Sequence, residues 1–223
     1  MIKNIMMNHG MPYFYRYHIK KTKSLTNGYD NLKDYIETIG DKCPHKYFLT
    51  GPRSSSLHFK LDFELKCMEG HEISKLASQA LINGNTRDAH TIVELFLLQH
   101  DNKTLAVELP LWLENNEIPD YNLIFNSKEP LTGHIDVLRI ENNKIWIWDY
   151  KPRAMNEKYA VTQTFFYALM LSKRTKIPLE NFRCGYFDSA YAFVFKPEEA
   201  VILRNKQLKS FIQYLFIINC SSK

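Results

Sequence analysis

A strand-like segment in the second half of the chain ends in two charged residues. Residues 145–151 read Ile-Trp-Ile-Trp-Asp-Tyr-Lys. Because side chains on a β-strand alternate between its two faces, Asp149 and Lys151 are predicted to share one face with the isoleucines, while the tryptophans and Tyr150 occupy the other. A carboxylate and an ammonium group would therefore emerge side by side at the end of an apolar strand.

A second carboxylate precedes this segment. Asp136 follows Gly133-His134-Ile135 and comes just before two apolar residues, where β-propensity favours a hydrophobic side chain. The polar run at 141–143 predicts a short turn, so residues 132–140 and 144–151 are expected to form an antiparallel hairpin. Asp149 lies thirteen positions after Asp136 across this turn, which brings both carboxylates within reach of one ion.

Two carboxylates placed in this way are typical of a site for a hard cation. With a backbone carbonyl they form an oxygen ligand set that suits Mg2+ or Mn2+, ions that keep several waters and accept phosphate oxygens as further ligands. A neighbouring lysine can orient or help to deprotonate an attacking water and stabilise charge on a phosphate. The alternative is an exposed Asp–Lys ion pair on a hairpin.

The segment after the hairpin favours the first interpretation. Residues 157–174 predict a helix, and Gln163 and Tyr167 are four positions apart, so one face presents an amide and a phenol together. In chain order the residues read GxxD, a short turn, DxK and QxxxY within 35 residues. This combination resembles the PD-(D/E)XK nuclease superfamily, in particular its RecB-like branch, which includes the nuclease domains of recombination helicase-nucleases and CRISPR-associated and mitochondrial exonucleases.

The resemblance covers residues 104–195 and implies roles for individual side chains. The two aspartates would be metal ligands with the Tyr150 carbonyl as a third, and the lysine would be the catalytic lysine. Gln163 and Tyr167 would support the site or contact the nucleic-acid strand. The implied catalytic residues are Asp136, Asp149, Lys151, Gln163 and Tyr167.

An N-terminal metal ligand is also implied. RecB-like nucleases usually carry a metal-binding histidine on an N-terminal helix, four residues after a glycine. The position four residues after Gly70 is Ser74, and His71, on the same helical face, is the expected substitute. The alternatives, two histidines and two glutamates, are His90, His100, Glu72 and Glu94.

Glu108 is a further candidate ligand. It lies in the strand-like run Val107-Glu108-Leu109-Pro110 and matches a glutamate that many relatives have before GxxD. The alternative is a charge on the outward face of a strand.

Hydrophobic periodicity changes from helical to strand spacing near residue 104. The segments with helical spacing are 31–39, 57–82, 86–99 and 157–174, those with strand spacing are 104–112, 132–140, 144–151 and 182–195, and residues 200–220 fit either. We predict an α/β (α+β) fold with a restriction-endonuclease-like core, a central mixed sheet flanked by helices. Residues 1–100 would be a mainly helical region of the same domain as the nuclease core at 101–223.

Composition excludes several classes of protein. The 223 residues are 45% hydrophobic and 24% charged, as in globular proteins, and no apolar run approaches the ~20 residues of a membrane span. We expect an intracellular, cytoplasmic protein, because the N-terminus lacks the apolar block of a secretory signal. The four scattered cysteines include no CxxC, which argues against a disulfide framework, a zinc finger or an iron–sulfur cluster. Without GxxxxGK[ST] no nucleotide cofactor is expected.

The chain begins with a basic, aromatic segment. No Asp or Glu precedes Asp30, and the basic residues before it account for the formal net charge of +5. Cations displace the counterions of nucleic acids and aromatic rings stack on bases, so this segment is a candidate binding arm. The alternative is a terminus whose aromatic side chains pack on the domain. The residues of this segment expected to contact nucleic acid are Arg16, Lys20, Lys21 and Lys23. Tyr167, on the later helix, is expected to contact it as well.

The expected function is metal-dependent hydrolysis of DNA by an exonuclease or an end- or flap-processing enzyme of replication, recombination or repair. It would act on single strands or duplex ends, and unwinding would need a helicase or recombination partner. One alternative is a catalytically inactive nucleic-acid-binding subunit with the same fold, and another is a dimeric junction-resolving or site-specific endonuclease. The joint presence of Asp136, Asp149 and Lys151 argues against the inactive subunit.

Overall fold

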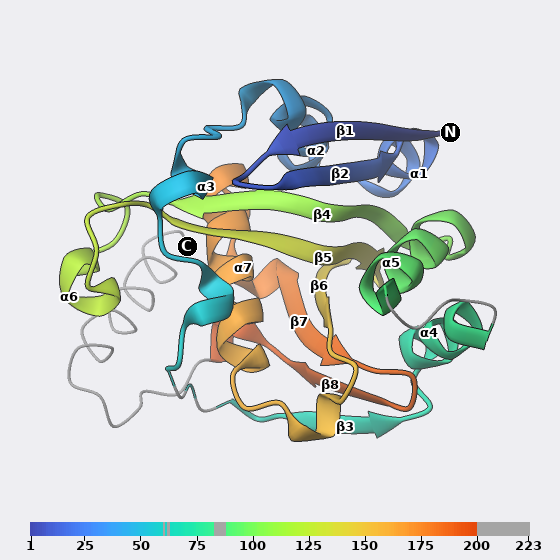
Figure 1. Ribbon diagram of the computed structural model, residues 1–223. Coiled ribbons are helices and arrows are strands. Elements are labelled where there is room, and N and C mark those ends of the chain that lie inside the picture. The colour runs from blue at the N-terminus through green and yellow to red at the C-terminus, as the bar shows by residue number, and fades with distance from the viewer. Residues whose placement is uncertain (60, 62, 83–87, 200–223) are drawn as a thin grey trace.

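The computed structural model describes the chain except residues 60, 62, 83–87 and 200–223, so the expectation for residues 200–220 lies outside the described residues. One mixed sheet of eight strands runs through the described residues in the order β1-β2-β4-β5-β6-β7-β8-β3, with the β1–β2 hairpin at one edge and β3 at the other (Figure 1). The β6–β7 pair is parallel and the other neighbours are antiparallel. The predicted α/β fold, a central mixed sheet flanked by helices, is confirmed.

The described strands and helices have the following bounds. The strands are β1 (Ile2–Asn8), β2 (Pro12–His18), β3 (Lys66–Glu69), β4 (Thr104–Leu113), β5 (Leu131–Glu141), β6 (Lys144–Tyr150), β7 (Phe182–Phe187) and β8 (Tyr191–Phe195). The helices are α1 (Ile19–Leu25), α2 (Asp30–Lys42), α3 (Tyr47–Thr50), α4 (Glu72–Ile82), α5 (Ala89–His100), α6 (Tyr121–Phe125) and α7 (Ala160–Thr175). None of these helices combines the length and apolar composition that a transmembrane span requires.

Two apolar cores cover opposite faces of the sheet. On one face, α2 and α7 pack against strand residues that include Ile145 and Ile147. On the other, α4 and α5 pack against Trp148 and Tyr150. The alternation predicted for β6 is therefore confirmed, and it explains why this strand is apolar on both sides: helices cover both faces.

The central hairpin forms as predicted. Glu141 pairs with Lys144 at the end of the β5–β6 ladder. Asn142 and Asn143 have φ of 51° and 55°, the left-handed conformation of both central residues in a type I′ turn, which asparagine tolerates better than most residues. The segment at 182–195 forms two strands, β7 and β8, that pair with each other.

The first eighteen residues differ from the helical expectation. They form the hairpin β1–β2, and β2 pairs with β4, so the start of the chain completes the sheet. Tyr15 and Tyr17 are buried, and the Tyr15 hydroxyl donates to the Ile36 carbonyl (2.7 Å). Tyr15 and Tyr17 thus pack on the domain, as the alternative predicted, whereas Phe14 is exposed. The alternation of Tyr13, Tyr15 and Tyr17 was a strand signal available in the sequence, because tyrosine favours strands.

A helix over residues 57–82 was also wrong in its first part. The helix α4 begins only at Glu72, and Lys66–Glu69 form the edge strand β3, which pairs with β8. All four β3 side chains are exposed, so this strand has no hydrophobic alternation to find in the sequence. Gly70, with φ of 63°, makes the turn between strand and helix.

Candidate active site

The two predicted aspartates lie together on the central hairpin. Asp149 is fully buried; its Oδ1 accepts a hydrogen bond from Nε2 of Gln163 (2.8 Å), and its Oδ2 lies 2.6 Å from Nζ of Lys151. Asp136 is 8% exposed, and its Oδ2 accepts from the backbone N–H of Tyr150 (2.9 Å). The hairpin therefore holds both carboxylates through defined donors.

The helix α7 fixes this arrangement from behind. Nε2 of Gln163 also donates to the Tyr167 hydroxyl (2.8 Å), so the QxxxY pair acts as one hydrogen-bonded unit on the buried face. A Cβ at Gly133 would lie 2.4 Å from both Oγ of Ser54 and Cε1 of Tyr167, too close for any side chain. The glycine of GxxD is required by this close approach. Tyr167 is 3% exposed, which places it beneath the site rather than at its surface.

A third and a fourth carboxylate complete the group. One oxygen from each of Glu94, Glu108 and Asp136 lies within 4.8 Å of the other two. Glu94 comes from α5, as does His90, four residues earlier, whose Nε2 is 3.7 Å from Oδ2 of Asp136. The (i, i+4) spacing puts both side chains on the same helix face.

Glu108 adopts an unusual backbone conformation within β4. Val107 pairs with Val137 and Leu109 with Ile135, so Glu108 stands opposite Asp136. Its φ of 56° is rare for a residue other than glycine and costs on the order of 1–3 kcal/mol, a cost typically found at functional sites. The Tyr13 hydroxyl on β2 donates a hydrogen bond to its Oε2.

Burial and mutual repulsion govern the electrostatics of this group. Burial, with smaller contributions from Asp136 and Asp149, raises the pKa of Glu108 to about 9, and burial with the adjacent Asp136 raises the pKa of Asp149 to about 7. The pKa of Glu94 is also raised, mainly by burial. Burial opposes the charge of Lys151, but the neighbouring aspartates outweigh it and raise its pKa.

The donor set fits a divalent cation. Oε1 of Glu94 is buried without a hydrogen-bond partner in the described part of the chain, and close carboxylates repel one another in a site of low dielectric. A cation bound between them would relieve both costs. These carboxylates can therefore hold a divalent metal, with His90 beside them.

The other residues considered as the N-terminal ligand lie elsewhere. The His71 ring packs beside Trp148 (5.4 Å between ring centroids), and the charged groups that shift its pKa include Arg139 and Glu72, not the site aspartates. Glu72 forms ion pairs with Lys103 and Arg139. The His100 ring packs against Phe96. The structure thus brings His90 and Glu94 to the group, and their common helix face was the signal available in the sequence.

The predicted basic contacts have different surroundings. Arg16 pairs with Val107 across β2 and β4, and its charge lowers the pKa of Glu94, which burial raises, so it lies near the carboxylates. Nζ of Lys21 donates to the carbonyls of Leu98 and Asp101 (2.6 Å each), which ties it to the C-terminal end of α5. The remaining two, Lys20 and Lys23, are exposed on α1.

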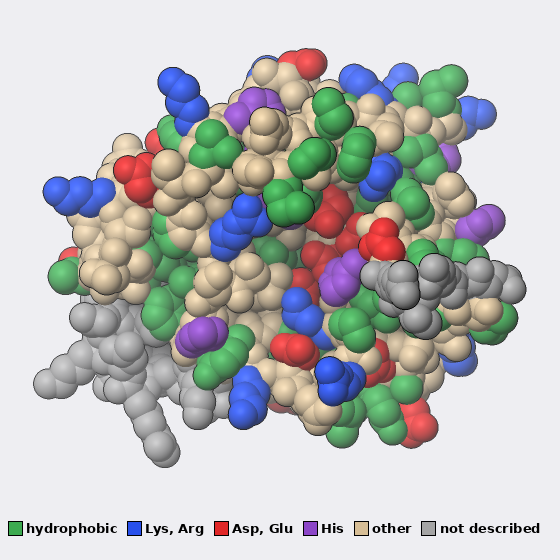
Figure 2. Space-filling model, viewed as in Figure 1, with side chains coloured by type: hydrophobic (Ala, Val, Ile, Leu, Met, Phe, Trp, Pro, Cys, Tyr) green, Lys and Arg blue, Asp and Glu red, His purple; other side chains and the backbone are tan. Residues whose placement is uncertain are grey.

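The surface above the group is open. Figure 2 shows acidic side chains gathered in a hollow in the middle of this face, beside a histidine and among lysine or arginine side chains.

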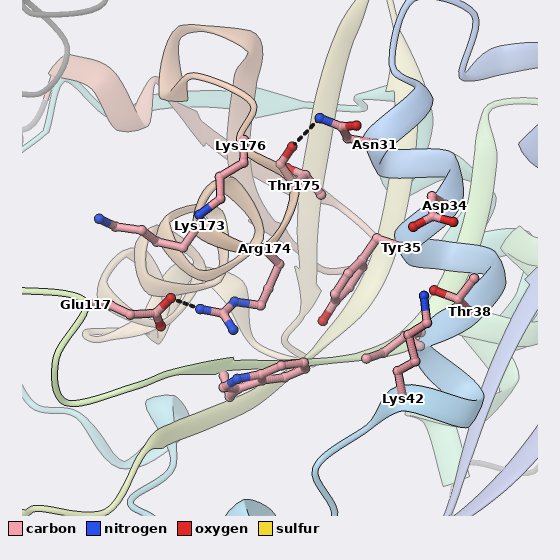
Figure 3. Close-up of a pocket in the computed structure, with 12 residues that line it drawn as sticks. Asn31, Asp34, Tyr35, Thr38, Lys42, Glu117, Lys173, Arg174, Thr175 and Lys176 are labelled. Atoms are coloured by element: carbon pink, nitrogen blue, oxygen red, sulfur yellow. Dashed lines mark hydrogen bonds and ion pairs between the residues drawn. The ribbon is translucent and has the colours of Figure 1, made fainter.

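A separate cavity of about 580 Å3 lies between α2, β4 and the C-terminal end of α7 (Figure 3). There Arg174 lies over the Trp112 ring (4.8 Å) and pairs with Glu117. Its lining residues are not those of the carboxylate group.

The family of the chain follows from its sequence, and the fold and the carboxylate group agree with it. The family model of the PD-(D/E)XK nuclease superfamily matches residues 65–215, and the chain belongs to this superfamily. Its members generally hydrolyse phosphodiester bonds and typically use divalent metals, so membership indicates a nuclease that acts on nucleic acid. No match was found among curated proteins or among solved structures.

Proposed function

We propose that this chain is a Mg2+- or Mn2+-dependent deoxyribonuclease that acts on DNA ends, as an exonuclease or an end- or flap-processing enzyme of replication, recombination or repair. The observation that carries the proposal is the convergence of Glu94, Glu108 and Asp136 on one point, with Asp149 and Lys151 beside them. A site of oxygen ligands favours Mg2+ and Mn2+ over softer metals.

The proposed metal ligands are the carboxylates of Asp136, Asp149, Glu94 and Glu108, together with the Tyr150 carbonyl. A divalent ion held there would lower the pKa of a bound water and neutralise charge on the scissile phosphate. The protein's own part is to hold these oxygens in place. The Tyr150 N–H fixes Asp136, and Gln163, itself bonded to Tyr167, fixes Asp149.

Lys151 is the proposed catalytic lysine. Its ammonium, 2.6 Å from Oδ2 of Asp149, is 19% exposed at the side chain, so it reaches the surface of a largely buried group. A cation at this place can orient the attacking water and stabilise negative charge that develops on the phosphate. The neighbouring carboxylates keep it protonated, because they raise its pKa.

Two further features support the RecB-like assignment and a nucleic acid as substrate. The helix α5, which precedes β4, β5 and β6, presents His90 next to Asp136, and a histidine on an N-terminal helix is usual in that branch. Arg16 near the carboxylates and the exposed Lys20 and Lys23 offer positive charge to a phosphate backbone. Unwinding of duplex DNA would come from a helicase or recombination partner.

The test is digestion of single- and double-stranded DNA labelled separately at the 5′ or 3′ end, with a single-stranded RNA in parallel. Each is incubated with Mg2+, Mn2+ or EDTA, using the wild type, Lys151→Ala and the exposed control Lys158→Ala. We expect metal-dependent release of one end label by the wild type and the control, and none by Lys151→Ala. Fixed internal cuts would indicate the endonuclease, and cleavage of RNA alone would reject DNA as substrate.

Binding measured on the same substrates separates catalysis from recruitment. Lys151→Ala should still bind DNA, because the remaining basic residues are unchanged. If the wild type binds DNA but leaves it intact in both metals, the proposal is wrong and the chain is a binding subunit that keeps the nuclease fold.

A further inference from the structure

A second cluster of metal-ligating side chains lies outside the carboxylate group. It consists of His9, in the loop between β1 and β2, Cys43, at the C-terminal end of α2, and His45, two residues further on. One ligand atom from each lies within 4.8 Å of the other two. The three residues come from two segments that are more than thirty positions apart in the chain.

Two of the three distances within this cluster are close to the edges of a tetrahedral zinc site. Nε2 of His9 lies 3.1 Å from Nδ1 of His45 and 3.7 Å from Sγ of Cys43. With Zn–N of about 2.0–2.1 Å and Zn–S of about 2.3 Å, tetrahedral angles give about 3.3 Å between two nitrogens and about 3.6 Å between nitrogen and sulfur. The two measured distances are therefore close to those of a tetrahedral zinc site, and the third, between Sγ of Cys43 and Nδ1 of His45, is below 4.8 Å.

The central ligand is held rigidly. His9 is 3% exposed and stacks on Phe48, with ring centroids 3.9 Å apart and an angle of 8° between the ring planes. Its Nδ1 lies 2.8 Å from Nε2 of His134. A proton on Nδ1, donated to His134, leaves the Nε2 lone pair facing Cys43 and His45, which is how a ligating histidine is usually oriented by its second nitrogen.

The other two ligands are brought together by the local backbone. The N–H of His45 donates to the Cys43 carbonyl (2.9 Å), which turns the chain at Pro44 so that both side chains approach His9. Cys43 is buried at 7% exposure, whereas His45 is exposed, so one side of the cluster is open to solvent.

We propose that His9, Cys43 and His45 form a zinc site, with water in the fourth position. Thiolate and imidazole ligands select zinc over magnesium, whereas the oxygen ligands of the carboxylate group suit magnesium or manganese. The protein would therefore bind zinc at the first site and magnesium or manganese at the second. Zinc binding displaces the proton of the Cys43 thiol, which is released to the solvent, since the thiolate is the ligand. This proposal does not depend on the nuclease proposal.

The zinc site would also support the carboxylate group. Tyr13 stacks on His134 (3.8 Å between ring centroids) and donates to Glu108, so a chain of contacts runs from His9 through His134 and Tyr13 to that carboxylate. Zinc would join the β1–β2 loop to the end of α2 and thereby fix this chain of rings. It acts here as a positioning element, not as a catalytic metal.

The test is titration of the metal-free full chain with Co2+, followed by displacement with Zn2+. Tetrahedral cobalt absorbs in the visible, and a cobalt–thiolate bond adds a charge-transfer band in the near ultraviolet that carboxylate ligands cannot produce. The variants are Cys43→Ser and His45→Ala, with Cys67→Ser and His100→Ala as exposed controls.

We expect one equivalent of cobalt with a thiolate band in the wild type and both controls, and loss of that band in Cys43→Ser. In His45→Ala the cobalt affinity should fall at least about tenfold, since even the loss of an outer partner of a metal ligand costs that much. Zinc should raise the unfolding temperature of the wild type by about 5 °C or more beyond any rise in Cys43→Ser, and a cooperative unfolding transition of this variant shows that it folds. A wild type without a thiolate band, or a band that survives in Cys43→Ser, overturns the proposal.

Discussion

Two of the antiparallel hairpins in the described sheet meet at β4 from opposite sides. The hairpin β5–β6 is central: most of its side chains are buried, and it carries Asp136 and Asp149. The hairpin β1–β2 is at the edge of the sheet, where β1 is mostly exposed and β2 alternates between more and less buried positions. It contributes Tyr13, whose hydroxyl reaches Glu108, and His9 in its loop.

The central hairpin and the edge hairpin contribute to the site in different ways. The central hairpin is held by strands on both sides and helices on both faces, so it can keep charged groups buried at fixed positions despite their repulsion. The edge hairpin has fewer neighbours and supplies rings and a hydroxyl that complete the site from outside. Substitutions on the first should therefore affect catalysis most, and those on the second should tune it.

The largest effect is expected for Asp149→Asn. The amide keeps the shape of the side chain but removes the charge that would hold a cation and pair with Lys151. Cleavage of DNA should fall by a factor on the order of 10³, within the range for loss of a group that acts in the reaction. Initial cleavage rates measure this, with Asp34→Asn, exposed on α2, as the matched control. A loss of less than tenfold would show that the central hairpin does not carry the chemistry.

A second prediction concerns the stability of the metal-free protein. Burial and Asp136 raise the pKa of Asp149 from 3.8 to about 7, and burial raises that of Glu108 from 4.5 to about 9. The folded state therefore binds more protons than the unfolded state between these values, and stability decreases as pH rises through that window. In EDTA the unfolding temperature should fall from pH 7 to pH 9, which lies above the range in which histidines with a lowered pKa, such as His9 and His134, contribute the opposite trend.

Two comparisons sharpen this prediction. The decrease with pH should be smaller in Asp149→Asn, because that group no longer titrates, and Mg2+ or Mn2+ should reverse it in the wild type at high pH. An unfolding temperature that rises from pH 7 to pH 9 in EDTA would contradict the account of the buried carboxylates.

Glycines of the two hairpins should respond differently to substitution. Gly133→Ala places a methyl group against Ser54 and Tyr167 and should cost about 1–3 kcal/mol of stability, as overpacking does. Gly10→Ala meets no atom within 4 Å but must adopt φ of 87°, at a cost of about 1 kcal/mol. Asparagine distinguishes backbone strain from steric overlap, because it tolerates a positive φ better than alanine but has a larger side chain. Gly10→Asn should therefore destabilise the protein less than Gly10→Ala, whereas Gly133→Asn should destabilise it more than Gly133→Ala. Urea denaturation measures all four.

The smallest effect is expected for Tyr13→Phe on the edge hairpin. It removes one hydrogen bond to Glu108, and such a bond contributes about 0.5–1.5 kcal/mol, which corresponds to a rate decrease of about two- to tenfold. The control is Tyr29→Phe, which removes a tyrosine hydrogen bond to the Asn143 carbonyl. Equal cleavage rates for Tyr13→Phe and the wild type would show that the edge hairpin does not tune the site.

The sequence predicted the central hairpin and the helix after it because their signals are local. Strand alternation, a two-asparagine turn and the (i, i+4) pair Gln163 and Tyr167 each need only neighbouring residues. These elements place Asp136, Asp149 and Lys151 together without knowledge of the rest of the fold.

The rest depends on contacts between distant parts of the chain. The strands β1 and β3 lie at the sheet edges with many exposed side chains, so their hydrophobic patterns are weak. The choice of His71 over His90 rested on spacing from a glycine, but only the packing of α5 against the sheet shows which helix faces Asp136. Tyr13 could not be found at all, because it reaches Glu108 across 95 positions of sequence.

The central claim is that α5, β4, β5 and β6 build one divalent-metal centre. Its most direct test is Mn2+ binding measured by titration calorimetry on the wild type, Glu94→Gln and Asp136→Asn, with His71→Ala as the comparison. The account predicts that both carboxylate variants lose binding at least about tenfold, as loss of a metal ligand does, and that His71→Ala binds like the wild type. Unchanged binding in Glu94→Gln and Asp136→Asn, or loss of binding in His71→Ala alone, would contradict it.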